Sequence, residues 1–224
     1  MNSLELTGQA RSHIVPIQAP PCELHAQVPR AFMAMRRAAA ADGLDLVAQS
    51  SFRDFSRQLA IWNGKWRGER VMNDQEGRPL KAADLSDDAR IDAILLWSAL
   101  PGASRHHWGT DVDLIDRRAV PEGYRVGLTV AEFSAGGPFA PLSAWLETHA
   151  ARFGFFRPFR GVRSGVQPEP WHFSFAPVAE GARRALKVEV LRQALAAAAL
   201  EGKQAVLARI EELHHCYVER IDWP

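Results

Sequence analysis

Apolar side chains recur at helical spacing over two stretches early in the chain, residues 30–41 and 54–67, and each stretch predicts a helix. Residues 44–52 between them alternate apolar with polar positions, which is typical of a strand. Residues 1–28 contain several prolines and many polar side chains, so they predict an arm or loop of low order. Residues 68–84 are polar, contain glycine and proline, and predict a loop.

The next helix is predicted to begin after Ser86, because the two acidic residues that follow suit the positive end of a helix dipole. It should run to about Leu100, where proline and glycine end it. The same signals predict a loop leading into a strand over residues 103–116 and an inserted loop over residues 117–137. A helix should then run from Pro138 or Pro141 to about Phe153. Strands over residues 155–176, with a turn near Val162 to Gln167, and helices over residues 178–199 and 203–220 should complete the chain. One α+β domain with a helical C-terminal extension is the simplest description of this order.

Composition narrows the functional classes. The 224 residues carry a formal net charge of +1, so no field of one sign favours binding to nucleic acid. No stretch is long and apolar enough to span a bilayer. The first residues have neither a basic start nor an apolar run, so we expect no signal peptide in this chain and a location in the cytoplasm, or in the periplasm after removal of a leader. Cys22 and Cys216 lie near opposite ends, and the sequence leaves open whether they pair or remain free thiols.

The segment from Ser104 to Asp113 carries the first candidate chemistry. His106 and Asp113 have side chains that are common zinc ligands. They are seven residues apart, so a regular strand would send them to opposite faces, but Gly109 permits a bend that brings them together. Asp111, by contrast, shares a strand face with Asp113.

A third candidate ligand is His172, which follows Glu169 by three residues. Pro170 argues against a helix here, so the segment predicts a turn entering a strand. On that strand Phe173 and Phe175 would share a core face, with His172 on the opposite face. From composition and spacing alone, a metal site and ordinary surface or hydrogen-bonded histidines both remain open interpretations.

Three segments together resemble a known family. Ser104-x-His106-x-x-Gly109-x-Asp111-x-Asp113 is similar to the Ser-x-His-x-x-Gly-x-Ala-x-Asp motif of the zinc D-alanyl-D-alanine carboxypeptidases and dipeptidases, the vancomycin-resistance enzymes and VanY-like peptidoglycan peptidases among them. Glu169-Pro170-Trp171-His172 resembles the family's Glu-x-x-His motif, and residues 50–58 resemble its Ser-Gly-Tyr-Arg-Ser-x-x-x-Gln segment. All three occur in the family's order, over roughly residues 46–176.

The resemblance implies a particular organisation of the chain. A small antiparallel sheet that carries a zinc site and is flanked by helices would occupy a peptidase domain over residues 30–176. The resemblance does not extend to either end of the chain. The residue pattern alone predicts an arm over residues 1–29 before this domain and a helical extension over residues 177–224 that packs on the same domain.

The resemblance also implies roles for individual residues. Zinc would be bound by His106, Asp113 and His172. Glu169 would be the catalytic base, taking a proton from water and returning it to the leaving amine. Arg53 matches the family's substrate-binding arginine, and its planar fork suits either a carboxylate or a developing oxyanion.

Three further positions are less defined. Ser104 is a candidate substrate-binding residue, with a turn or capping role as the alternative, and Gln58 is a second candidate. Asp111 stands where the family has alanine, so the identity of the zinc-binding aspartate is open. Asp111 is either a competitor of Asp113 or an acceptor that orients a ligand histidine.

The expected function is zinc-dependent hydrolysis of peptidoglycan stem peptides, most simply the removal of a terminal D-alanine. The expected partner is a peptide that ends in D-Ala-D-Ala. One alternative is an endopeptidase that cuts inside the stem peptide, as a cell-wall lytic enzyme does. Another is a zinc-binding module without catalysis, against which the presence of Glu169 and Arg53 argues.

Overall fold

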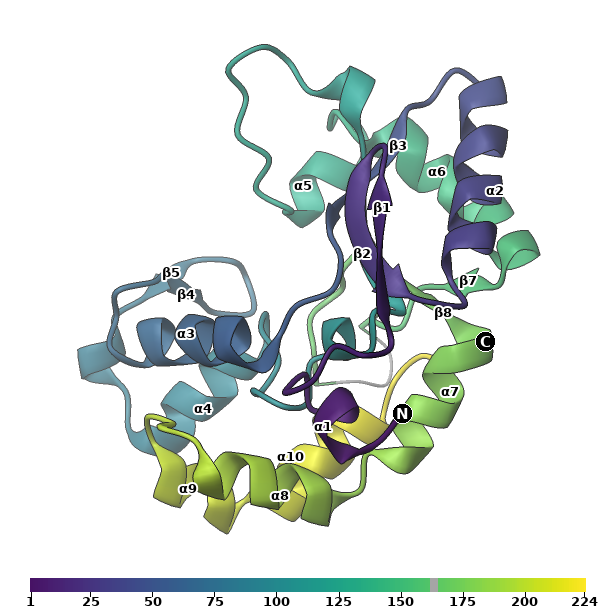
Figure 1. Ribbon diagram of the computed structural model, residues 1–224. Helices are drawn as coiled ribbons and strands as arrows, with labels where there is room; N and C mark the ends of the chain where they lie inside the picture. The colour runs from purple at the N-terminus through teal and green to yellow at the C-terminus, as the bar shows by residue number, and fades with distance from the viewer. Residues whose placement is uncertain (162–164) are drawn as a thin grey trace.

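The centre of the fold is a four-stranded antiparallel sheet in the order β3-β6-β8-β7 (Figure 1). The structure, a computed structural model, describes residues 1–161 and 165–224, and it confirms the predicted α+β fold with a small antiparallel sheet. The strands are β1 (Ile14–Gln18), β2 (Pro21–His25), β3 (Leu46–Ser50), β4 (Met72–Asn73), β5 (Pro79–Leu80), β6 (Asp111–Asp116), β7 (Phe155–Phe156) and β8 (His172–Phe175). The turn predicted near Val162 to Gln167 lies partly outside the described residues.

The helices surround this sheet. They are α1 (Ser3–Leu6), α2 (Pro29–Ala41), α3 (Phe55–Trp66), α4 (Asp87–Leu95), α5 (Val130–Phe133), α6 (Ala140–His149), α7 (Ala176–Ala185), α8 (Val188–Ala197), α9 (Lys203–Ala208) and α10 (Ile210–His214), with a π-helical turn over His215–Glu219. None of the helices in the described ranges is long and apolar enough to cross a membrane.

The helices α2, α3 and α6 lie close to their predicted ranges, but the C-terminal prediction of two long helices is wrong. Residues 178–199 are divided between α7 and α8, and residues 203–220 between α9, α10 and the π-helical turn. The first break follows from packing: Leu186 is completely buried, and its carbonyl oxygen lies 2.6 Å from Nε2 of His214. The break lets both flanking helices cover the same core.

The prediction of low order for residues 1–28 is also wrong. Strands β1 and β2 pair over their full lengths as a hairpin, and Leu24 and Val28 are completely buried. Trp108 anchors the preceding α1 by donating its indole N–H to the carbonyl of Leu6 over 3.1 Å. The prolines are tolerated because Pro16 lies in β1, an edge strand, and Pro21 is the first residue of β2. The predicted loop 68–84 likewise contains a hairpin, β4-β5, and α5 lies within the predicted loop 117–137.

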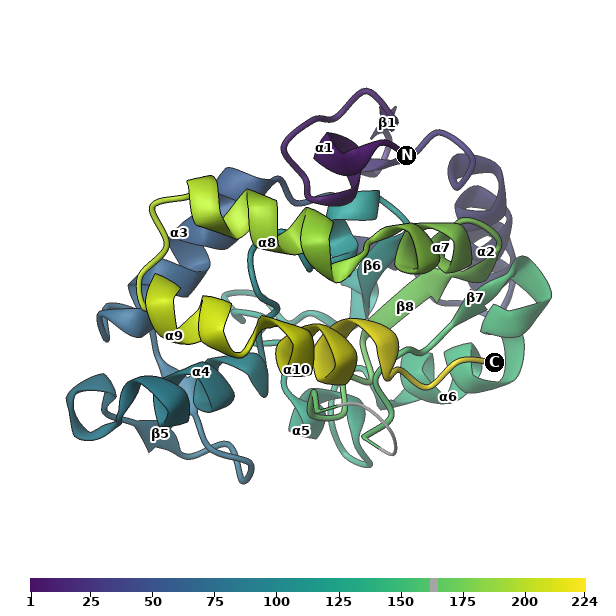
Figure 2. The same ribbon diagram turned by 90° about the horizontal axis from the view of Figure 1, so that it is seen from below.

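Two hydrophobic clusters flank the region of the site. One packs α2 and α6 against the sheet, through side chains such as Phe32, Val112 and Phe173. The other joins α3 and α4 to the C-terminal helices, which lie side by side in Figure 2, through Trp62 and Leu195 among others. Cys22 and Cys216 are free thiols, and burial raises the pKa of Cys22 to about 11.

Candidate active site

A short helical turn over Arg105–Trp108 places His106 beside the start of β6. Gly109 ends this turn with a left-handed φ of 66°, which confirms the predicted bend. A side chain at Gly109 would also collide with the N-terminal hairpin, since a Cβ there would lie 2.4 Å from Cδ1 of Ile14 and 2.6 Å from the backbone nitrogen of His25. Glycine is therefore required both for the turn and for the close approach of the hairpin.

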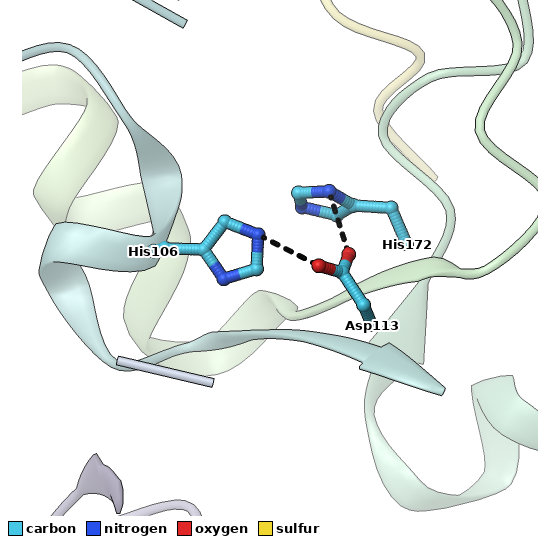
Figure 3. Close-up of side chains that lie close together, drawn as sticks. All are labelled: His106, Asp113 and His172. Atoms are coloured by element: carbon cyan, nitrogen blue, oxygen red, sulfur yellow. Dashed lines mark ion pairs between the residues drawn. The ribbon is translucent and has the colours of Figure 1, made fainter. Parts of the chain in front are cut away.

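The structure brings the three predicted ligands together (Figure 3). Oxygen atoms of Asp113 lie 3.5 Å from Nε2 of His106 and 3.5 Å from Nδ1 of His172. One potential ligand atom from each residue lies within 4.8 Å of the other two, and all three side chains are buried. The pairing of β6 with β8, which sets Asp113 opposite His172, produces this arrangement.

In His106 and His172, the ring nitrogen that points away from Asp113 makes a hydrogen bond that fixes the orientation of the ring. Nδ1 of His106 lies 2.9 Å from the carbonyl oxygen of Ser51, and Nε2 of His172 lies 2.9 Å from Oδ1 of Asp111. Both partners are acceptors, so these nitrogens carry the protons and donate. The opposite nitrogen of each ring is thereby directed toward Asp113, as metal coordination requires.

Asp111 therefore lies behind the ligand set and not within it. Its buried carboxylate accepts hydrogen bonds from Nε of Arg105 over 2.8 Å, from the hydroxyl of Thr110 over 2.5 Å and from the hydroxyl of Ser174 over 2.9 Å. Burial opposes ionisation, but the charge of Arg105 and the hydrogen bond from His172 outweigh it and hold the pKa of Asp111 well below its usual range. This geometry favours the second of the two roles predicted for Asp111.

The residues present fit a zinc ion. Oδ1 of Asp113 is buried and has no hydrogen-bond partner among the described residues, so it needs a cation or another donor. Two imidazoles and one carboxylate form a typical donor set for a catalytic zinc site. Burial would lower the pKa of His172, yet Asp111, Glu169 and Asp113 raise it to about 10, which shows how strongly this site favours positive charge.

Glu169 lies next to the ligand set, as predicted. Its Oε2 is 2.9 Å from Nδ1 of His172, the nitrogen that faces Asp113. The side chain is 12% exposed and lines a cleft of about 770 Å³. The backbone N–H of Glu169 donates to the carbonyl of Phe159, which fixes the turn before β8. A carboxylate so placed can exchange a proton with a molecule bound in the cleft.

Arg53 lines the same cleft, and hydrogen bonds to two neighbouring side chains fix its guanidinium. Nη1 donates to Oε1 of Gln58 over 2.9 Å, and Nη2 donates to the hydroxyl of Ser50 over 3.2 Å. Gln58 itself is completely buried and is not among the residues that line the cleft, and its amide donates to the carbonyl of Ala99. The structure thus places the polar atoms of Gln58 against Arg53 and Ala99, and its role in binding substrate stays a prediction.

Ser104 lies at the start of the turn that carries His106, and it lines the cleft. Its hydroxyl makes no capping hydrogen bond, so the capping alternative is not seen. Of the two tryptophans in the motifs, Trp171 lines the cleft, whereas Trp108 is completely buried under the guanidinium of Arg105.

Sequence reasoning missed His107, which supports the backbone of Arg53. Its Nδ1 donates to the carbonyl of Arg53 over 2.6 Å, and its Nε2 accepts the N–H of Gly102 over 3.1 Å. Burial lowers the pKa of His107 to about 3, so the ring is neutral in both bonds. Adjacent histidines look like surface polarity in a sequence, and only the contact with the distant Arg53 reveals this role.

Two other residues near the cleft were not predicted. Tyr217, from the π-helical turn near the C-terminus, lines the cleft, and burial raises its pKa to about 12. Lys65 of α3 has a pKa lowered to about 8 by burial, and Glu169 and Arg53 are the charges that act on it most strongly. Neither lies in a motif, so no signal in the sequence connects them with the site.

The site has the composition of a mononuclear metallopeptidase: two histidines and one aspartate lie together beside a glutamate. Asp113 and His172 lie on paired strands of the antiparallel sheet, and His106 lies on the turn that precedes β6. A family model described as VanY, D-alanyl-D-alanine carboxypeptidase, matches residues 21–178, and the chain belongs to this family of enzymes. The resemblance seen in the three motifs and the predicted enzyme class are both confirmed.

The chain is also similar to individual proteins. A Haemophilus influenzae protein with no assigned activity is 36% identical over 121 residues, which cover 53% of this chain and 92% of the relative. A D-alanyl-D-alanine carboxypeptidase of Enterococcus faecalis is 26% identical over 144 residues, which cover 63% of this chain and 44% of the relative.

Solved structures share the fold. VanYB in complex with D-alanine-D-alanine gives a TM-score of 0.54 at 20% identity, covering 88% of this chain and 90% of that chain. A Zn(II) complex of a point mutant of the vancomycin-resistance D,D-pentapeptidase VanY gives a TM-score of 0.52 at 21% identity, covering 78% of this chain and 85% of that chain. At these identities the likeness establishes the common fold.

Proposed function

We propose that this protein is a zinc-dependent D-alanyl-D-alanine carboxypeptidase that acts on peptidoglycan stem peptides. The observation that carries the proposal is the convergence of His106, Asp113 and His172 at a cleft, with the Glu169 carboxylate 2.9 Å from Nδ1 of His172. Membership of the VanY family and the D-alanine-D-alanine complex of the structural relative support the substrate class.

In this proposal His106, Asp113 and His172 hold the zinc ion. When bound, zinc polarises a carbonyl and lowers the pKa of water to about 7. Glu169 accepts a proton from the attacking water and returns it to the amine of the departing D-alanine. Hydrogen bonds to Asp111 and to the Ser51 carbonyl keep both imidazoles in the required orientation throughout.

Arg53 supplies the positive charge on the substrate side. Its guanidinium lines the cleft on a backbone fixed by His107, and Gln58 limits its rotation. A planar guanidinium binds a carboxylate through parallel hydrogen bonds, so Arg53 is suited to the free C-terminus that a carboxypeptidase must recognise. Ser104, which lines the same cleft, can add a hydrogen bond to that carboxylate.

Mass spectrometry of products from a defined pentapeptide muropeptide tests the proposal. The zinc-loaded protein should release free D-alanine, and a chelator should abolish the release. Glu169→Ala should lower kcat by about 10²- to 10⁴-fold while zinc stoichiometry stays at one, because Glu169 is not a ligand in this proposal. Glu122→Gln, a change at an exposed carboxylate outside the cleft, is the matched control and should retain full turnover.

Each alternative has a different product pattern. Larger peptide fragments without free D-alanine would assign the protein to the endopeptidases. No hydrolysis of D- or L-terminated peptides by zinc-loaded protein would favour a binding module. Unchanged turnover in Glu169→Ala would refute the role of Glu169 even if D-alanine is released.

A further inference from the structure

One wall of the cleft comes from the segment between β6 and α6 that the sequence predicts as an inserted loop. Residues 127–131 of this segment line the cleft. They lead into α5, which lies across from the β4-β5 hairpin in Figure 1, and residues of that hairpin turn line the cleft as well. Two short segments outside the three motifs therefore contribute to the lining of the cleft.

The carboxylate of Glu132 organises this wall. Glu132 is buried, with 5% of the residue exposed. Its carboxylate accepts hydrogen bonds from the N–H of Gly127 over 2.9 Å and from the N–H of Thr129 over 2.6 Å. The hydroxyls of Thr129 and Tyr124 donate to the same carboxylate over 3.1 and 2.8 Å. These bonds lower the pKa of Glu132 although burial opposes it, so the acceptor is a carboxylate.

Leu128 is the residue enclosed by the two backbone donors. The N–H groups of Gly127 and Thr129, on either side of Leu128, donate to one carboxylate, and the backbone of Leu128 between them has a φ of 52°. No other non-glycine residue in the described ranges has a positive φ. A left-handed conformation is unfavourable for a residue with a Cβ, so the four hydrogen bonds to Glu132 stabilise a backbone conformation that only glycine adopts without strain.

The position of the Leu128 side chain connects this strain to the site. It lines the cleft, and it packs against the hydrophobic cluster that contains Trp171 and Phe133. Trp171 is the residue between the base Glu169 and the ligand His172. An apolar residue of the cleft wall thus packs against the cluster that contains the residue between the proposed base and a proposed ligand.

We propose that Leu128, held in a left-handed conformation by Glu132, is a specificity-determining residue that restricts the substrate to a small side chain, such as the methyl group of alanine, beside the scissile bond. This inference rests on the proposed function. A leucine on a rigid wall excludes a larger substrate side chain by overlap, while a methyl group still fits against it.

The test compares three tripeptide substrates with the zinc-loaded full chain: acyl-L-Lys-D-Ala-D-Ala, and the same peptide with D-leucine at the last or at the penultimate position. Leu128→Gly removes the wall and fits the left-handed backbone without strain. At one of the two positions it should raise kcat/KM for D-leucine relative to D-alanine by about tenfold or more, as expected when an apolar pocket is enlarged. Leu128→Asn is the matched control, because asparagine tolerates this backbone and has a similar size, so it should keep the wild-type ratio.

An unchanged ratio at both positions in folded Leu128→Gly would overturn the inference. Should the wild-type protein hydrolyse none of the peptides, the proposed function fails, and calorimetric binding of the same three peptides decides the role of Leu128 separately. In that case the measured quantity is the ratio of the Kd for a D-leucine peptide to the Kd for the D-alanine peptide. For one of the two D-leucine peptides this ratio should be about tenfold lower in Leu128→Gly than in wild type. Equal affinity ratios in the two proteins would overturn the inference on this readout too.

Discussion

At Asp111 four hydrogen-bond donors meet one carboxylate that has no exposed surface. The donor from His172 belongs to a proposed zinc ligand, and the donor from Arg105 carries a full charge. Alanine at this position would remove the acceptor of Nε2 of His172 and would leave the guanidinium of Arg105 buried without a carboxylate partner. Asp111 therefore combines two roles, as the buried ion-pair partner of Arg105 and as the acceptor that orients a proposed ligand.

We expect Asp111→Ala to weaken zinc binding by about 10- to 100-fold, because a ligand histidine loses the acceptor that fixes it. The free energy of unfolding should fall by about 3–5 kcal/mol, because Arg105 is left as an uncompensated buried charge. Chelator competition measures the zinc affinity, and urea denaturation measures the stability. The double variant Arg105→Met/Asp111→Ala removes both charges and should recover stability without recovering zinc affinity. Restoration of both would show that Asp111 serves only to neutralise Arg105.

His107 should make the metal-free protein sensitive to acid. Its pKa is lowered by burial to about 3, whereas an unfolded histidine titrates near 6.5. Its contribution to stability is therefore complete above about pH 6.5 and is lost as the pH falls toward 3, at up to about 1.4 kcal/mol per pH unit.

Urea denaturation of chelated protein between pH 6 and pH 4 measures this slope. In His107→Asn the free energy of unfolding should fall less steeply with pH than in wild type. The matched control is His215→Asn, at a histidine whose side chain is 61% exposed, and it should show the wild-type slope. A wild-type slope in His107→Asn would mean that other buried groups account for the acid sensitivity.

Among the elements, the turn that ends at Gly109 depends most on one residue. Gly109→Ala should cost about 2–4 kcal/mol, because a Cβ is unfavourable at this φ and would overlap Ile14 and the backbone of His25. Gly43→Ala is the matched control: its φ of 85° is similarly left-handed, but no atom lies within 4 Å of the added Cβ, so about 1 kcal/mol is expected. Urea denaturation measures the free energy of unfolding of both variants. Equal decreases would show that the contact with the N-terminal hairpin does not add to the cost of Gly109→Ala.

The elements that the sequence predicted are those with a local signal. The helices α2 and α3 follow an apolar repeat, and the bend at Gly109 follows from the spacing of His106 and Asp113. The N-terminal hairpin was missed because its prolines indicate loops, while its stability comes from packing on the distant Gly109 turn. The break between α7 and α8 contains neither glycine nor proline, and it results from burial of Leu186.

For the whole molecule, the C-terminal helices and the region that holds Arg53 share one hydrophobic cluster. Leu195 of α8 is completely buried in the cluster that contains Trp62 of α3. Leu195→Ala should therefore lower the free energy of unfolding by about 2–5 kcal/mol. Tryptophan fluorescence and zinc release should report the same, lowered urea midpoint, because Trp108, on the turn that carries the proposed ligand His106, belongs to the same cluster. Val71→Ala, at a side chain that is 67% exposed, should change stability by less than about 0.5 kcal/mol.

Separate transitions for fluorescence and zinc release would contradict a shared core. The same long-range packing explains which parts of the site the sequence could predict. Ligands and base lie in ordered motifs, so His106, Asp113, His172 and Glu169 could be named in advance. The contacts of Gln58 and the approach of Tyr217 depend on tertiary structure, and a motif carries no record of either.

Tyr217 also has a consequence for the order in which the chain is synthesised. Both halves of the ligand set, and Glu169 with them, leave the ribosome before Tyr217 does. The cleft that Tyr217 lines thus acquires its final shape only when the last helices have folded against α3 and α4. A segment that ends before Tyr217 therefore holds every proposed catalytic residue but not the whole lining of the cleft.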